Sequence, residues 1–263
     1  MIDPAPIGAA DGASCDTPPS PIEAWPDRLD AACRGLRFLR GAVVVRETGS
    51  TQDLARGRAA GDAVVAWRQT SGRGRDGRTW ADTGLGGVAM TAVAAVQGAW
   101  IALAAGVAAA EAIERVAPSV TVGLKWPNDL MIAGRKVGGV LIERDGEASL
   151  IGIGINVSQP SFDGELATRA TSLAIAGTCV DRLVLLEALL PRLDHWLAAG
   201  EAVTIEAFQR RDMLRGRVVR LSAAGSTIEG LIESIDPLAA IRVRAADRVH
   251  EVDPSTARIE SFE

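Results

Sequence analysis

The sequence has no tyrosine, two histidines and three cysteines among its 263 residues. The cysteines, Cys15, Cys33 and Cys179, are odd in number and lack C-x-x-C spacing. They predict neither a disulfide framework nor a zinc site, and they fit a reducing compartment. The histidines, His195 and His250, are too isolated to form a metal cluster. The scarce residue types therefore argue against disulfide-stapled and zinc-dependent proteins.

Lysine and asparagine are almost absent. Of the 28 lysines and arginines only two are lysine, Lys125 and Lys136, and the chain has only two asparagines, Asn128 and Asn156. All four lie within one short part of the chain. An ammonium group and a neutral amide offer geometries that arginine and aspartate do not. We therefore expect these positions to carry specific tasks.

The chain also has no excess of positive charge, because its formal net charge is −5. This charge argues against broad nucleic-acid binding. Residues 88–110 carry no charge, and this length permits a membrane span. Their alanine-rich composition instead favours a buried strand, a turn at Gln97 and Gly98, and a buried helix at residues 99–116. The N-terminus lacks the regions of a secretory signal, so we expect a cytoplasmic protein. We also expect that it binds neither DNA nor membrane.

The order of the remaining patterns predicts an α+β protein with three parts. Residues 1–40 are predicted to be an N-terminal arm, partly disordered because prolines crowd its first half, with a short amphipathic helix in residues 25–40. Residues 41–214 are predicted to form a catalytic domain. Residues 215–263 contain four short alternating runs separated by turn signals, which predict a small antiparallel barrel similar to an SH3-like module.

Within the central part, a strand is predicted at residues 43–46, followed by a helix that ends near residue 60. Ser50 or Thr51 fits the N-cap of this helix, but the same hydroxyls suit the polar edge of a neutral ligand, so both interpretations stay open. Residues 137–157 read as a hairpin at the centre of a sheet. Two amphipathic helices follow at residues 181–215, and Pro191 is expected to kink or restart the first.

Residues 71–80 read SGRGRDGRTW. Arginines interspersed with glycines, closed by Trp80, make a flexible cationic loop that can wrap a polyanion and offer a ring for stacking. A disordered basic tether is the competing interpretation, although strand-like residues flank the loop. The G-x-G-x-x-G spacing also matches a dinucleotide-binding fingerprint, but no helix start follows Gly77 and the position about twenty residues on, Gln97, is not acidic.

Three further motifs follow this loop: KWPND at residues 125–129, KVGGVLIE at residues 136–143 and GIGINV at residues 152–157. With these four motifs in this order, the chain resembles the biotin protein ligases that lack an N-terminal DNA-binding domain. The resemblance implies a mixed-sheet catalytic domain related to class II aminoacyl-tRNA synthetases and lipoate ligases, with a C-terminal SH3-like domain. It also implies activation of biotin by MgATP to biotinyl-5′-AMP, and transfer of the biotinyl group to a lysine of a biotin carboxyl carrier protein from acetyl-CoA carboxylase or a related biotin-dependent carboxylase.

The resemblance also assigns roles to residues of this sequence, and joining two anions requires positive charge at the reacting centre. The implied catalytic residues are Lys136, Arg73 and Arg75. The implied biotin contacts are Ser50, Thr51, Gln52, Gln69, Gly72, Arg73, Gly74, Arg75 and Lys136. The implied ATP contacts are Arg75, Arg78, Trp80, Lys125, Asn128 and Asn156, and Asp129 is implied to help hold Mg²⁺. Lys125 has a competing structural role in pairing with a nearby carboxylate, and Gln52 stands where the family usually has asparagine.

Two other functions stay open. One is a lipoate or octanoate ligase or transferase of the same fold, which would need a longer apolar slot and fewer amide and hydroxyl groups. The other is a non-catalytic biotin-binding relative, against which the complete set of lysine, arginine and aspartate positions argues. The chain is expected to be a monomer or a homodimer.

Overall fold

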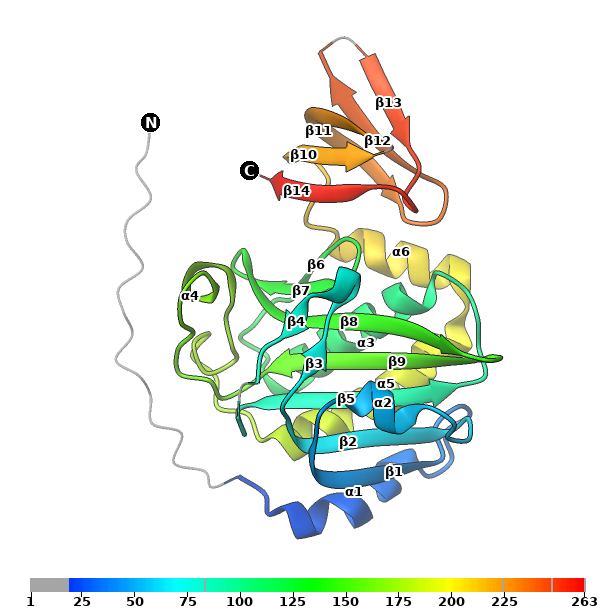
Figure 1. The fold of residues 1–263 in the computed structure, drawn as a ribbon, viewed down its shortest axis with the longest axis vertical. Coiled ribbons are helices and arrows are strands. Elements are labelled where there is room, and N and C mark those ends of the chain that lie inside the picture. Colours follow the sequence, from blue (N-terminus) through cyan, green and yellow to red (C-terminus); the bar gives the residue numbers. More distant parts are fainter. Residues whose placement is uncertain (1–18, 83, 224, 247, 263) are drawn as a thin grey trace.

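The structure, a computed structural model, describes residues 19–82, 84–223, 225–246 and 248–262. The disorder predicted for the first residues and the position of Cys15 lie outside these ranges. The described chain forms a large mixed sheet covered by helices, followed by a small antiparallel sheet (Figure 1). The predicted α+β class is confirmed.

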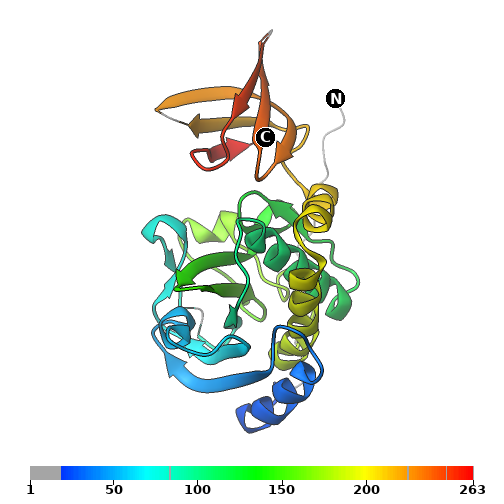
Figure 2. The ribbon, with the colours of Figure 1, turned by 90° about the vertical axis from the view of Figure 1, so that its right-hand side faces the viewer.

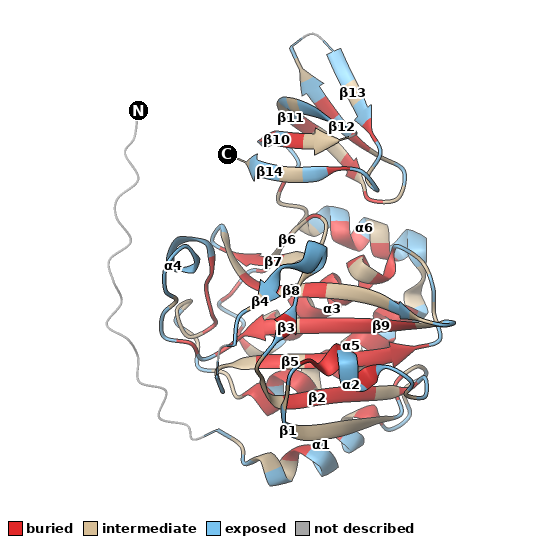
Figure 3. Cartoon of the chain, viewed as in Figure 1, coloured by how far each residue is buried: buried red, intermediate tan, exposed pale blue. Residues whose placement is uncertain are grey.

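The main sheet has seven strands in the order β1-β2-β5-β9-β8-β7-β6. They are β1 (Gly41–Thr48), β2 (Asp62–Gln69), β5 (Gly87–Ala94), β6 (Gly123–Lys125), β7 (Asp129–Ile132), β8 (Arg135–Asp145) and β9 (Ala148–Asn156). Strands β1 and β2 are parallel, and a parallel pair needs a crossover connection, which here contains the short helix α2 (Thr51–Ala55). All other neighbours are antiparallel. The predicted hairpin is confirmed by β8 and β9, with β9 central and buried along most of its length (Figure 3).

Two long helices, α3 (Ile101–Val116) and α5 (Arg182–Ala199), cover one face of the sheet (Figure 2). Helix α3 lies between the strands and α5, and so it is apolar on nearly every side. The uncharged run therefore divides into β5 and α3, as predicted. No described helix is long and apolar enough to cross a membrane. Helix α5 runs through Pro191, so the expected restart there is wrong, because buried leucines on both sides hold the helix in place.

Helix α1 (Trp25–Cys33) confirms the helix predicted in residues 25–40, and it packs against α5 and β1. The rings of Trp25 and Trp67 contact each other, and the guanidinium of Arg182 lies over both, 5.0 Å from the centroid of Trp25 and 4.3 Å from that of Trp67. It donates hydrogen bonds to the carbonyls of Trp67 and Gly87, and burial lowers its pKa to about 10. Residues from Trp25 onward thus pack as part of the main body, although they lie in the span predicted to be an arm.

After α6 (Glu201–Arg211) the chain forms a five-stranded antiparallel sheet in the order β13-β12-β11-β10-β14 (Figures 1 and 2). The strands are β10 (Val218–Ala223), β11 (Ser226–Asp236), β12 (Ala240–Ala245), β13 (Arg248–Val252) and β14 (Arg258–Phe262). The first four confirm the predicted runs, and β14 was not predicted. The architecture agrees with an SH3-like domain. The domain boundaries at residues 40 and 214 stay predictions.

The remaining elements are short. They are η1 (Ile22–Ala24), β3 (Gly72–Arg73), η2 (Arg75–Gly77), β4 (Thr79–Trp80) and α4 (Leu166–Arg169). Strands β3 and β4 pair with each other, so residues 71–80, the glycine–arginine loop, form a small ordered ribbon rather than a tether. A strand and no helix follows Gly77, which agrees with the rejection of the dinucleotide-binding interpretation.

The contact between α3 and α5 gives a stability prediction. Replacing the buried Leu189 by alanine removes apolar contacts and leaves a cavity, so we expect Leu189→Ala to lower the free energy of unfolding by about 2–5 kcal/mol. Val184 lies on the same helix but is 41% exposed, and Val184→Ala should change that free energy by about 0.5 kcal/mol or less. Urea denaturation measures both, and equal effects would contradict the packing described here.

Candidate active site

Helix α2 and the glycine–arginine loop lie on the face of the main sheet opposite α3 and α5 (Figures 1 and 2). A cavity of about 320 Å³ lies between these two segments and the strands. Its floor comes from β5, β8 and β9, and its walls come from the start of α2, the glycine–arginine loop and the KWPND turn. Residues 255–259, which comprise the turn before β14 and the first two residues of that strand, complete the wall. The cavity thus gathers segments that lie as far apart in the sequence as Ser50 and Ile259.

The cavity brings together most of the predicted site residues. Those that line it are Ser50, Thr51, Gln52, Gln69, Arg73, Gly74, Arg75, Arg78, Trp80, Lys125, Asn128, Asp129 and Lys136. Two others do not line it. Gly72 packs against the side chains of Gln69 and Trp80, and a Cβ at this position would stand 2.5 Å from Gln69 Nε2. Asn156 is buried beside the cavity and donates from Nδ2 to the Thr171 carbonyl at 3.0 Å.

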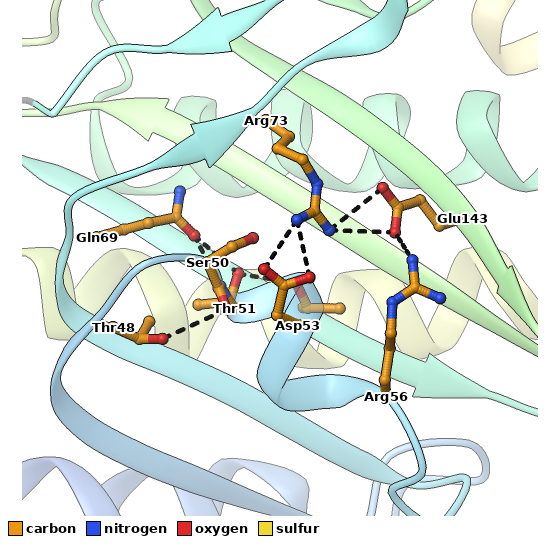
Figure 4. A network of polar contacts seen from close by, with 9 residues as sticks. Thr48, Ser50, Thr51, Asp53, Arg56, Gln69, Arg73 and Glu143 are labelled. Atoms are coloured by element: carbon orange, nitrogen blue, oxygen red, sulfur yellow. Dashed lines mark hydrogen bonds and ion pairs between the residues drawn. The ribbon is translucent and has the colours of Figure 1, made fainter. Parts of the chain in front are cut away.

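Neutral hydrogen-bonding groups line the part of the cavity next to β2 and β5. The backbone N–H and the hydroxyl of Thr51 both donate to Gln69 Oε1, at 2.9 and 3.2 Å (Figure 4). The Thr51 hydroxyl also lies 2.8 Å from that of Thr91, so its orientation is fixed. Ser50 stands at the N-cap of α2, but its side chain makes no capping hydrogen bond. Its hydroxyl is therefore available to a ligand.

Gln52 contributes a buried amide with an unused acceptor. Its Nε2 donates to the Leu141 carbonyl at 3.0 Å, while its Oε1 has no hydrogen-bond partner among the described residues. A Cβ at Gly152 would lie 2.9 Å from this Nε2, so the amide packs directly on the strand. A buried acceptor without a partner costs about 1–3 kcal/mol. A ligand N–H that reaches Oε1 would remove this cost.

Charged groups gather at the β7 and β8 side of the cavity. Lys136 forms an ion pair with Asp129, and its Nζ lies 5.6 Å from the centroid of the Trp80 ring. The ring lies on β9 at Gly154, where a Cβ would stand 3.0 Å from the ring atoms. Nearby, Asn128 Nδ2 donates to the Val140 carbonyl at 2.7 Å. The ammonium, the carboxylate and the ring therefore form one cluster on the floor of the cavity.

Lys125 is the second lysine of the cavity. Burial lowers its pKa, Asp129 opposes this effect, and the charges of Lys136, Arg169 and Arg78 add to it. Within the described ranges no carboxylate forms an ion pair with Lys125, because Asp129 pairs with Lys136 instead. The Lys125 ammonium lies 5.0 Å from the centroid of the Phe262 ring on β14. Among the residues that the structure describes, the carboxylate pairing considered for Lys125 is therefore not present.

The arginines of the glycine–arginine loop differ in their contacts. Arg73 pairs with Asp53 at 2.8 Å and with Glu143 at 3.4 Å (Figure 4). Arg75 and Arg78 line the cavity, and neither forms an ion pair with a described residue. The two unpaired guanidinium groups can therefore bind an anion without first breaking a contact.

Comparisons with known proteins agree with this geometry. Residues 44–159 match the model of the biotin/lipoate A/B protein ligase family. The biotin–[acetyl-CoA-carboxylase] ligase of Mycobacterium tuberculosis is 33% identical over 240 residues, which cover 83% of this chain and 88% of that protein. The enzyme of the same name from Paracoccus denitrificans is 30% identical, over 73% of this chain and 87% of that protein.

The chain belongs to the biotin protein ligase family. Its fold is similar to that of the biotin protein ligase from Aquifex aeolicus in complex with biotin and ATP, with a TM-score of 0.75 and 27% identity over 83% of this chain and 98% of that chain. The family and the fold predicted from the four motifs are thus confirmed.

Sequence reasoning missed several parts of this biotin protein ligase site. Thr91 lies in a strand that reads as ordinary core, and residues 255–259 lie far from the motifs in sequence. Arg258 pairs at 2.6 Å with Asp76 of the glycine–arginine loop and so joins the C-terminal sheet to the cavity. None of these contacts has a local pattern, since each depends on how distant segments meet.

The lowered pKa of Lys125 gives a prediction about stability. The unfolded chain binds this proton more tightly than the folded protein, so the ammonium lowers the free energy of unfolding at pH 7. This penalty disappears as the pH rises through the window just below 10.5. We expect Lys125→Met to raise the free energy of unfolding at pH 7. The increase of that free energy with pH, expected for the unaltered protein just below pH 10.5, should be absent from this variant.

Urea denaturation at several pH values checks this expectation. Arg217→Met is the control, because Arg217 is exposed and its substitution relieves no burial. A lower stability of Lys125→Met at pH 7, or an equal gain from Arg217→Met, would contradict the role assigned to burial.

Proposed function

We propose that the chain activates biotin with ATP to form biotinyl-5′-AMP and then transfers the biotinyl group to a lysine of a biotin carboxyl carrier protein. The observation that carries this proposal is the division of one cavity into a neutral hydrogen-bonding side and a cationic side. The neutral side suits the ureido ring of biotin, and the cationic side suits its carboxylate and the phosphates of ATP.

Biotin is proposed to bind with its ring toward α2. The ring offers N–H donors and a carbonyl acceptor, and Ser50, Thr51 and Gln69 present hydroxyl and amide groups to match them. The free Oε1 of Gln52 adds a buried acceptor at the same place, so the departure from the usual asparagine preserves the polar character of the pocket. The valeryl tail would then run along β5 and β9, past Met90 toward Lys136.

In the first step a carboxylate oxygen of biotin attacks the α-phosphorus of ATP. The bond between that phosphorus and the bridging oxygen breaks, and pyrophosphate leaves. The approach of one anion to another is opposed by their charges, so cations placed at the reacting oxygens stabilise the transition state. Lys136 and Arg75 are proposed to do this, with Arg78 toward the triphosphate. Arg73, the third predicted catalytic residue, already shares its charge with two carboxylates.

The nucleotide is proposed to lie near Trp80, which offers a flat ring, with Asn128 and Lys125 beside it. Asn156 lies outside the lining of the cavity, and its predicted contact with ATP stays a prediction. Mg²⁺ would arrive as MgATP. Among the described residues no cluster of three or more His, Cys, Asp or Glu side chains could hold a metal. A single carboxylate, that of Asp129, together with substrate phosphates fits the way Mg²⁺ is usually bound.

In the second step the amine of a carrier lysine attacks the acyl carbon of biotinyl-5′-AMP. The amide bond forms, the bond to the phosphate oxygen breaks, and AMP leaves. The relatives from Mycobacterium tuberculosis and Paracoccus denitrificans are named for acetyl-CoA carboxylase, so the carrier of that enzyme is the proposed partner. The oligomeric state and the cytoplasmic location stay predictions.

A mass-spectrometric assay tests the proposed substrate. The protein is mixed with ATP, Mg²⁺ and either biotin, lipoate or octanoate, and the acyl-adenylates are measured. We expect biotinyl-5′-AMP, because amide and hydroxyl groups fill the end of the cavity that a lipoyl or octanoyl chain would need to be apolar. A preference for lipoyl- or octanoyl-AMP would instead support the alternative transferase, and binding of biotin without adenylate formation would support a non-catalytic relative.

Loss of the Lys136 ammonium should slow the first step strongly. We expect Lys136→Ala to cost about 3 kcal/mol of transition-state stabilisation or more, which is a fall in rate of at least about 100-fold. Single-turnover formation of biotinyl-5′-AMP measures this rate. Arg135→Ala changes the neighbouring cation, which does not line the cavity, and serves as the control. Near-normal adenylate formation by Lys136→Ala would refute the role given to this residue.

A further inference from the structure

Four charged side chains at the α2 end of the cavity form a connected network, which we call the clasp: Asp53, Arg56, Arg73 and Glu143 (Figure 4). Arg73 Nη1 donates to both carboxylate oxygens of Asp53 at 2.8 Å. Arg73 Nη2 donates to the two oxygens of Glu143 at 3.5 and 3.4 Å, and Arg56 pairs with Glu143 as well. Two guanidinium groups and two carboxylates thus balance one another in charge.

The clasp joins three parts of the chain that surround the cavity. Asp53 lies on α2, Glu143 on β8 and Arg73 at the start of the glycine–arginine loop. Asp53 directly follows Gln52, and Gln52 donates to the carbonyl of Leu141, two residues before Glu143. The ion pairs therefore cross the same end of the cavity at which the ureido ring of biotin is proposed to bind.

The clasp involves one arginine of the glycine–arginine loop and not the other two. The charge of Arg73 is used within the protein, whereas the charges of Arg75 and Arg78 are unpaired among the described residues. At the root of the loop, the backbone N–H of Ser71 also donates to the Gly49 carbonyl at 2.8 Å. The root is thus fastened to α2, β8 and the end of β1, while the following arginines stay available to the ligands.

We propose that Asp53 and Glu143 are positioning residues, which hold Arg73 and the root of the glycine–arginine loop over the α2 end of the cavity and so retain the biotinyl group of the adenylate. This inference rests on the proposed function. The adenylate can leave only when the loop lifts, and lifting the loop breaks the clasp. Removing a carboxylate raises the fraction of open loops, and release accelerates by the same factor.

The test measures release of preformed biotinyl-5′-AMP from the protein by rapid dilution into excess unlabelled biotin and ATP. We expect Asp53→Asn and Glu143→Gln each to release the adenylate about fivefold faster, the scale of one exposed ion pair. The rate of adenylate formation and the KM for ATP should change by less than about twofold, because neither carboxylate lines the cavity. If the carboxylates served only to stabilise the fold, their removal would change adenylate formation and the KM for ATP along with adenylate release.

Two variants control for other effects. Asp53→Glu keeps the carboxylate and should restore most of the retention. Glu233→Gln breaks an ion pair of similar kind with Arg244, on the C-terminal sheet, and should leave release unchanged. Raising the salt concentration should speed release from the unaltered protein more than from Asp53→Asn, because salt screens only a pair that is present. Unchanged release from both clasp variants would overturn the proposal.

Hydrogen exchange tests the clasp without any chemistry. In the ligand-free protein, peptides that cover residues 71–80 should exchange faster in Asp53→Asn and Glu143→Gln than in the unaltered chain or in Glu233→Gln. Equal exchange would overturn the clasp even if biotin is activated normally. If the unaltered protein forms no biotinyl-5′-AMP, the proposed function fails, and the exchange result still decides whether these carboxylates hold the loop.

Discussion

The site depends on side chains that pack directly against the backbone of two neighbouring strands, β8 and β9. Gly154 on β9 leaves room for the Trp80 ring, and Gly139 on β8 leaves room for the Lys136 ammonium, which a Cβ there would meet at 3.2 Å. Gly152 does the same for a glutamine amide. Side chains at these positions would lift the ligand-facing groups off the sheet. The glycines of these motifs therefore make the floor of the cavity flat. They do not make it flexible, since all three lie within paired strands.

The second constraint is the placement of charge. The chain has a net charge of −5, yet one cavity collects two lysines and four arginines. Burial works against this arrangement, as the lowered pKa of Lys125 shows. Asp129 offsets part of the cost by pairing with Lys136. An anionic ligand that enters such a site meets positive groups already held in place, so little reorganisation remains for the moment of reaction.

Local sequence patterns predicted most of the fold, because periodicity and turn residues act over short distances. The β8–β9 hairpin, α3 and the four runs of the C-terminal sheet are examples. The motifs also located most of the residues that line the cavity. They did not predict β14, nor that residues 255–259, which end on its first two residues, close the wall of the cavity. They also did not predict the pairing of Arg73 with Glu143 across 70 positions. Such contacts depend on the final packing of distant segments, which a local pattern does not record.

Asn156, whose implied contact with ATP stays a prediction, has a protein contact that the motif did not reveal. The folded chain uses its amide to hold the Thr171 carbonyl, and the backbone N–H of Thr171 in turn donates to the Lys136 carbonyl at 2.8 Å. A motif gives the residue type and its approximate place. Which group the side chain contacts is decided by the segment at residues 170–172, which crosses the ends of β8 and β9.

Exposed ion pairs hold the glycine–arginine loop in place. Such pairs are weak, and a weakly held loop is compatible with an acyl-adenylate that must later be transferred. An acyl-adenylate must be kept from water, but it must also meet a lysine on another protein. A buried ion pair would cost several kcal/mol to break and would hold the loop shut. An exposed pair contributes about 1 kcal/mol or less, so the loop at Asp53 and at Arg258 can open without unfolding its surroundings. Several weak contacts at separate points of one short loop thus favour the closed state while keeping it reversible.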